Sequence, residues 1–144
     1  MIEPDTVRLL RECDAGIRMG VAAIDDVLPY VNSETFRDDL ISCKEEHTKL
    51  DEQIQTALSD YHDHGKKPNI MAKGMSWLKT NVRLAIDESD KTIAHLMTDG
   101  CNMGVKTLNQ FLNQYAAADE NAKDIAKRLI KQEETLAMNA RPYL

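Results

Sequence analysis

The fold is decided by VRLLRECDAGIRMGVAAIDDVLPYV at residues 7–31 and FRDDLISCKEEHTKLDEQIQTALSDY at residues 36–61. In both stretches the inward positions recur at alternating steps of three and four residues, which places them on one face of an α-helix. Each face is interrupted by a single ionisable residue, Asp14 in the first stretch and His47 in the second. The pattern predicts two amphipathic helices whose apolar faces must leave water together.

Only a short turn separates the two stretches, since Val31 ends one and Phe36 begins the other. The predicted helices therefore lie antiparallel. Asp14 lies 18 positions before the turn residue Asn32, and His47 lies 15 positions after it. At about 1.5 Å per residue, this difference amounts to about 4.5 Å of helix. The sequence therefore predicts that Asp14 and His47 lie at nearly the same height.

The remaining chain is predicted to close over this pair as the other half of a bundle. The predicted helices cover residues 5–31, 33–64, 69–86, 90–116 and 119–140. No strand-like alternation and no glycine-rich phosphate loop interrupts them. Together they predict a single all-α domain over residues 1–144, an antiparallel four-helix bundle in which a crossover containing the shorter helix joins two long hairpins.

The second hairpin repeats the layout of the first. Glu133 is the ionisable residue on the inner face of the last helix, and Cys101 lies at a matching height on the helix before it. Gly100 and Gly104 lie one turn apart on the inner face of that helix and disfavour it by about 1 kcal/mol each. They predict either a tight helix crossing or space kept open beside the core. A local break at residues 98–100 is the competing interpretation.

The composition is that of a globular protein, with 29% charged and 42% hydrophobic residues. A net charge of −6 argues against nucleic acid or an anionic membrane as the main partner. No apolar run approaches the ~20 residues of a membrane span, and the first residues lack a secretory-signal pattern. The odd number of widely spaced cysteines (Cys13, Cys43 and Cys101) predicts reduced thiols and a cytoplasmic location.

The candidate chemistry rests on Asp14, His47, Glu133 and Cys101. Burying such groups without partners costs several kcal/mol, so they must be paired, protonated or metal-bound. A carboxylate–histidine set at the centre of a bundle has the ligand types for a single iron, manganese or zinc ion. The alternative is a buried Asp14–His47 ion pair, with Glu133 at the bundle edge, that holds the helix register and binds nothing.

The layout of two long helix pairs around a shorter segment containing GMSWLK (residues 74–79) resembles the ferritin-like, rubrerythrin-related bundles. More narrowly, it is similar to a bacterial ferritin-like group related to the DUF2383 domains. Di-iron members of the superfamily carry a Glu on each of two helices and a Glu-x-x-His on each of the other two. The resemblance implies a bundle of this kind with a metal site at its centre.

The residues match this ligand pattern only in part. Asp14, His47 and Glu133 occupy three of the six ligand positions. Lys44 and Leu136 stand where a Glu and a His would complete the two motifs, and none of residues 100–102 is acidic. A di-iron oxidase is therefore not expected, and what the resemblance implies is a mononuclear or degenerate site.

Three functions follow as hypotheses. The preferred one is a non-catalytic structural or interaction module that acts as a homodimer or with another protein. The second is a mononuclear metalloprotein in iron handling or redox defence, with Asp14, His47 and Glu133 as ligands. The third is a small-ligand binder that uses a cavity beside Gly100 and Gly104.

Overall fold

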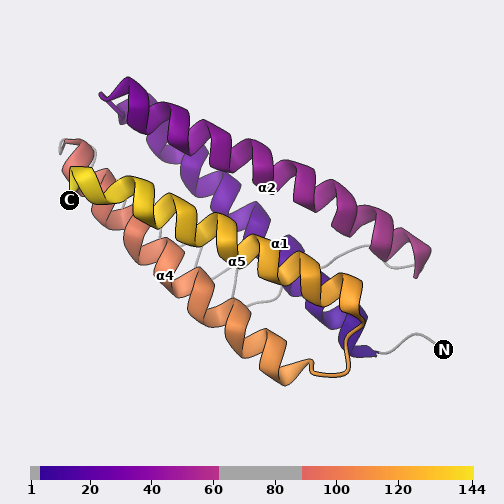
Figure 1. Cartoon of the computed structure of the whole chain (residues 1–144). Coiled ribbons are helices and arrows are strands. Elements are labelled where there is room, and N and C mark those ends of the chain that lie inside the picture. Colours follow the sequence, from indigo (N-terminus) through magenta and orange to yellow (C-terminus); the bar gives the residue numbers. More distant parts are fainter. Residues whose placement is uncertain (1–3, 62–88) are drawn as a thin grey trace.

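The computed structural model describes residues 4–61 and 89–144 (Figure 1). Its helices are α1 (Pro4–Val27), α2 (Glu34–Asp60), α4 (Asp90–Gln114) and α5 (Glu120–Ala140), with short 3-10 turns at Leu28–Tyr30 and Arg141–Tyr143. These described ranges contain no strand, which confirms the all-α prediction for them. The helix predicted at residues 69–86 lies outside the described residues, as do residues 62–64.

At one end of the bundle, hydrogen bonds hold the start of α1 and the end of α2 against the turn between α4 and α5. The backbone N–H of Asp119, in the turn between α4 and α5, donates to Oγ1 of Thr6 at 2.8 Å. The hydroxyl of Tyr61, at the end of α2, donates to Oδ2 of the same Asp119 at 2.8 Å. The start of α1, the end of α2 and the α4–α5 turn therefore lie together.

At the opposite end, the Asp90 carboxylate at the start of α4 accepts the backbone N–H groups of Asn32 and Ser33, at 2.8 and 2.9 Å. Since α2 ends at one end of the bundle and α4 begins at the other, α2 and α4 run in the same direction. Helices α1 and α5 run the other way, so each hairpin is antiparallel, as predicted (Figure 1).

The helix ends follow from capping residues and from one proline. Ser33 caps α2 by accepting the N–H of Phe36, and Asp119 caps α5 by accepting the N–H of Ala122. The prediction that the first helix continues to residue 31 is wrong, because α1 ends at Val27. Pro29 has no N–H for an α-helical hydrogen bond, and the chain tightens into a 3-10 turn. Helix α4 is continuous through residues 98–100, so the competing local break does not occur.

The core consists of two apolar clusters, one toward each end of the bundle. The first includes Ile24, Leu40, Met97 and Leu136, and the second includes Ile17, Leu50, Leu108 and Leu129. On α1, α2, α4 and α5 a short interval separates the two clusters, and this interval holds His47 on α2 and Glu133 on α5. Within the described part of the chain, no helix combines the length and apolar character needed to cross a membrane.

Candidate functional site

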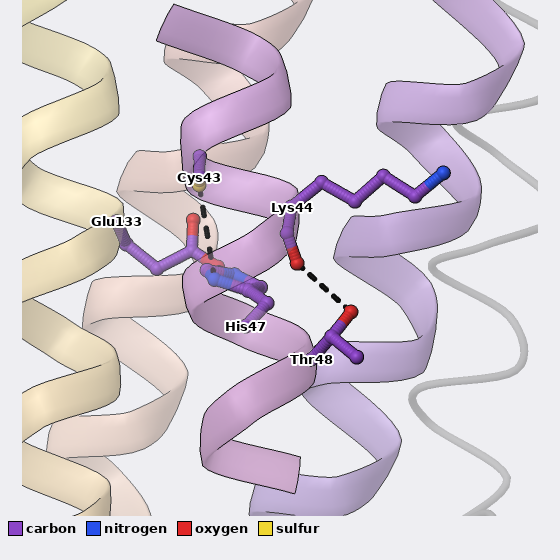
Figure 2. A network of polar contacts seen from close by, with 5 residues as sticks. All are labelled: Cys43, Lys44, His47, Thr48 and Glu133. Atoms are coloured by element: carbon purple, nitrogen blue, oxygen red, sulfur yellow. Dashed lines mark hydrogen bonds and ion pairs between the residues drawn. The ribbon is translucent and has the colours of Figure 1, made fainter.

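His47 lies between the two apolar clusters, at mid-length of α2, with only 1% of its surface exposed. Its Nε2 lies 3.2 Å from Oε1 of Glu133, and its Nδ1 lies 3.7 Å from Sγ of Cys43, one turn earlier on α2. Figure 2 shows Glu133 reaching from α5 toward the ring of His47, whereas Lys44 extends the other way. The structure therefore places an imidazole between a carboxylate and a thiol in the centre of the bundle.

The neighbours of His47 decide its charge. Burial disfavours a charged imidazole, but hydrogen bonds to Cys43 and Glu133 and the nearby negative charge raise the pKa of His47 to about 10. The ring is therefore protonated at neutral pH and donates to the Glu133 carboxylate. Glu133 is 13% exposed, so the ion pair has one edge close to solvent.

Asp14 is fully buried, as predicted, but its predicted pairing with His47 is wrong. Its Oδ1 accepts hydrogen bonds from Nε of Arg18 at 3.1 Å and from Nε2 of Gln55 at 3.0 Å. The residue of α1 opposite His47 is Gly20, where an added Cβ would lie 3.3 Å from the imidazole. Gly20 is six residues beyond Asp14, which corresponds to about 9 Å along the helix.

The conformation of the turn contributes to this difference in height. The 3-10 turn at Leu28–Tyr30 rises about 2.0 Å per residue, more steeply than an α-helix, and Val31 is extended. The chain therefore travels further before α2 begins its return. Counting equal numbers of residues back and forward from Asn32 would place Gly20 opposite Lys44. In the structure Gly20 lies opposite His47, three residues further along α2.

A cavity of about 40 Å³ lies beside the His47–Glu133 pair. It is lined by all four glycines of the described residues, Gly16, Gly20, Gly100 and Gly104. A Cβ added at Gly100 would meet no atom within 4 Å, whereas one at Gly104 would lie 3.5 Å from the carboxyl carbon of Glu133. Space is thus kept open beside Gly100 and Gly104, as one interpretation of this glycine pair predicts.

The remaining wall of the cavity is mostly aliphatic and includes the thiols of Cys43 and Cys101. All three cysteines of the chain are free and buried. Burial, together with the charge of Glu133 and a hydrogen bond to it, raises the pKa of Cys101 well above its usual range. Burial likewise raises the pKa of Cys13 to about 12. These two thiols stay protonated at neutral pH and lack the thiolate character of a nucleophile.

The three predicted ligands are not brought together as one set, because His47 contacts Glu133 while Asp14 contacts Arg18 and Gln55 instead. In residues 4–61 and 89–144, no three His, Cys, Asp or Glu side chains are arranged to hold a metal ion. Cys43 and Glu133 contact opposite nitrogens of the same ring, so they do not converge on one point. The described residues do not fit the metal site that the resemblance implies. Of the predicted candidates, the structure joins His47, Glu133 and Cys101 and leaves Asp14 apart.

Three contacts of the buried polar residues are missed by the sequence reasoning. Cys43 precedes His47 by four residues, and Arg18 follows Asp14 by four residues, so helical spacing alone could have found both contacts. The contact of Gln55 with Asp14 joins two helices. It depends on the height of one helix relative to the other, which the periodicity does not give.

Comparison with protein-family models, with curated proteins and with solved structures gives no match. The fold and the site therefore define the class of protein by themselves: an all-α helical bundle with a buried histidine–glutamate ion pair beside a central cavity. The ferritin-like resemblance stays a prediction from the sequence.

Proposed function

We propose that this chain binds a small, neutral and mostly apolar ligand in the central cavity. The observation that carries the proposal is that the four glycines converge on one space between the two apolar clusters. Each glycine disfavours its helix by about 1 kcal/mol relative to alanine. At Gly100 no neighbouring atom requires the missing side chain, because a Cβ there would meet nothing.

The size and polarity of the cavity limit the ligand. One water needs about 10–15 Å³ of such space, so a cavity of about 40 Å³ takes a molecule of a few heavy atoms. His47 and Glu133 already neutralise one another, and Cys101 bonds to the same carboxylate. A charged ligand would bring an uncompensated charge into the core, which favours a neutral one.

Xenon is a suitable probe because it is apolar and of the right size. Under xenon pressure, NMR signals of the lining residues Ile24, Leu108 and Leu129 are expected to shift in a saturable manner. Gly104→Leu fills the space beside Glu133 and should abolish the shifts, whereas Gly104→Ala adds only a methyl group in ordinary contact and should retain them. Shifts that are absent in the wild type, or unchanged in a folded Gly104→Leu variant, would contradict the proposal.

The preferred hypothesis from the sequence, a structural or interaction module, leads to a different result. The His47–Glu133 pair can hold the helix register without a ligand, since both partners bond to each other. On that hypothesis the cavity has no natural occupant, so a folded Gly104→Leu variant that fills it should be at least as stable as the wild type.

A further inference from the structure

A second buried polar cluster lies between α1 and α2, and its Asp14 is about 9 Å along α1 from Gly20, the residue that faces His47. It joins Asp14 and Arg18 of α1 with Asp51 and Gln55 of α2. Oδ1 of Asp14 accepts two hydrogen bonds, but its Oδ2 is buried without a donor. Oδ1 of Asp51 is buried without a donor as well. Two carboxyl oxygens therefore lack a proton donor where the two side chains meet.

The two carboxyl groups are close enough to share a hydrogen bond, which requires that one of them be protonated. Burial, followed by the hydrogen bond to Asp14 and the negative charge of Asp14, raises the pKa of Asp51 to about 7. Arg18 on α1 and Gln55 on α2 itself act in the opposite direction. Asp14, Arg18 and Gln55 are thus the side chains that act on the pKa of Asp51, and the charge of Asp14 also contributes to raising the pKa of its neighbour Cys13.

We propose that Asp14 and Asp51 form a proton-sharing carboxyl pair that couples the docking of α1 on α2 to pH near neutrality. One proton supplies the missing donor for both oxygens. It also balances the charge, because Arg18 compensates one carboxylate and the proton neutralises the other. A divalent cation at the same place would leave one excess positive charge beside Arg18, which disfavours a metal as the occupant.

Solvent access makes such a proton exchangeable. Asp51 is only half-buried and lines a surface groove between α1 and α2 that also contains Arg18, Val21 and Thr48. Asp25 in the same groove is engaged by Lys44 at 2.6 Å. A proton can therefore leave Asp51 through the groove while the rest of the bundle stays folded. The charged pair that remains would weaken the contact between α1 and α2.

Asp51→Asn tests the pair because its amide donates to Asp14 at every pH. The folded wild type holds the proton up to pH about 7, whereas an unfolded aspartate releases it near pH 4. Folding is therefore favoured at low pH, and the wild-type folding constant should fall by up to about tenfold per pH unit across this range. The variant should lack that slope. The matched control is Glu52→Gln, which removes an exposed carboxylate next to Asp51 and should keep the wild-type dependence of the folding constant on pH.

Carboxyl carbon NMR gives a second readout, because it follows the titration of the aspartates in the folded protein directly and needs no stability measurement. An aspartate signal that titrates near pH 7 and is absent from Asp51→Asn supports the pair. Equal slopes in the wild type and Asp51→Asn, or titration of every aspartate near pH 4, would overturn it. Stabilisation of the wild type, but not of Asp51→Asn, by added Mg²⁺ or Ca²⁺ would identify a cation in place of the proton and would overturn it too.

Discussion

The most consequential residue is His47, because its charge depends on the two side chains that contact its ring, Cys43 and Glu133. Buried hydrogen bonds to a charged group contribute about 1.5–3 kcal/mol to stability, and Glu133 supplies this bond to the imidazolium. In the unfolded chain a histidine loses its proton near pH 6.5. Because the pKa of His47 is raised in the folded protein, the contribution of the pair is complete below pH 6.5. It is lost as pH rises toward 10.

The corresponding variant is Glu133→Gln, which keeps the shape of the side chain and removes its charge. We expect it to destabilise the protein by about 2 kcal/mol at pH 6, and the loss should shrink toward zero above pH 10. Urea unfolding at pH 6, 8 and 10 measures the effect. The exposed neighbour Glu134→Gln serves as the control. A loss that does not change with pH would show that His47 is neutral in the folded protein.

Burial of single residues is largely predictable from the sequence, because it depends on local helical spacing. Asp14 and His47 interrupt apolar faces, and the structure buries both almost completely. Their partners are not predictable in the same way, since the contact of Asp14 with Gln55 and of His47 with Glu133 depends on the heights of different helices. An error of a few residues in the position of the turn is enough to assign Asp14 the wrong partner.

At the scale of the helix, the glycines of α1 and α4 differ in what surrounds them. Gly100 faces open space, whereas the methyl group of an alanine at position 20 would press against Cδ2 and Nε2 of His47 at 3.3 Å. His47 is held by Cys43 and Glu133 and cannot shift freely. The helical cost of a glycine is similar at both positions, so the surroundings determine the outcome of replacing it.

We therefore expect Gly100→Ala to stabilise the protein by up to about 1 kcal/mol and Gly20→Ala to be neutral or destabilising. Denaturant unfolding of the two variants side by side measures the difference, and each variant is the matched control for the other. Equal stabilisation by both changes would mean that the contact between α1 and His47 is looser than the structure indicates.

At the scale of the whole molecule, polar contacts join the ends of the two hairpins in addition to the apolar core. The Asp90 carboxylate of α4 holds two backbone N–H groups of the α1–α2 turn. At the turn between α4 and α5, Thr6 accepts the backbone N–H of Asp119, and Tyr61 donates its hydroxyl to the Asp119 carboxylate. These contacts fix the direction of each hairpin relative to the other, which the periodicity of single helices cannot give.

Asp90→Ala is expected to cost about 1–3 kcal/mol and to accelerate hydrogen exchange at the amides of Asn32 and Ser33. The matched control is Glu120→Ala, since Glu120 is likewise an acid in the first turn of its helix and is exposed. The control separates the effect of the helix dipole from that of the two hydrogen bonds. A loss in Asp90→Ala no greater than in Glu120→Ala would show that the turn does not depend on α4.

The central ion pair also determines which hairpin can associate with which. The first hairpin contributes the cation through His47, and the second contributes the anion through Glu133. Two copies of the first hairpin, packed in the same way, would oppose imidazolium to imidazolium, and two copies of the second would oppose carboxylate to carboxylate. The unlike signs thus disfavour self-association of either half and make each half selective for the other.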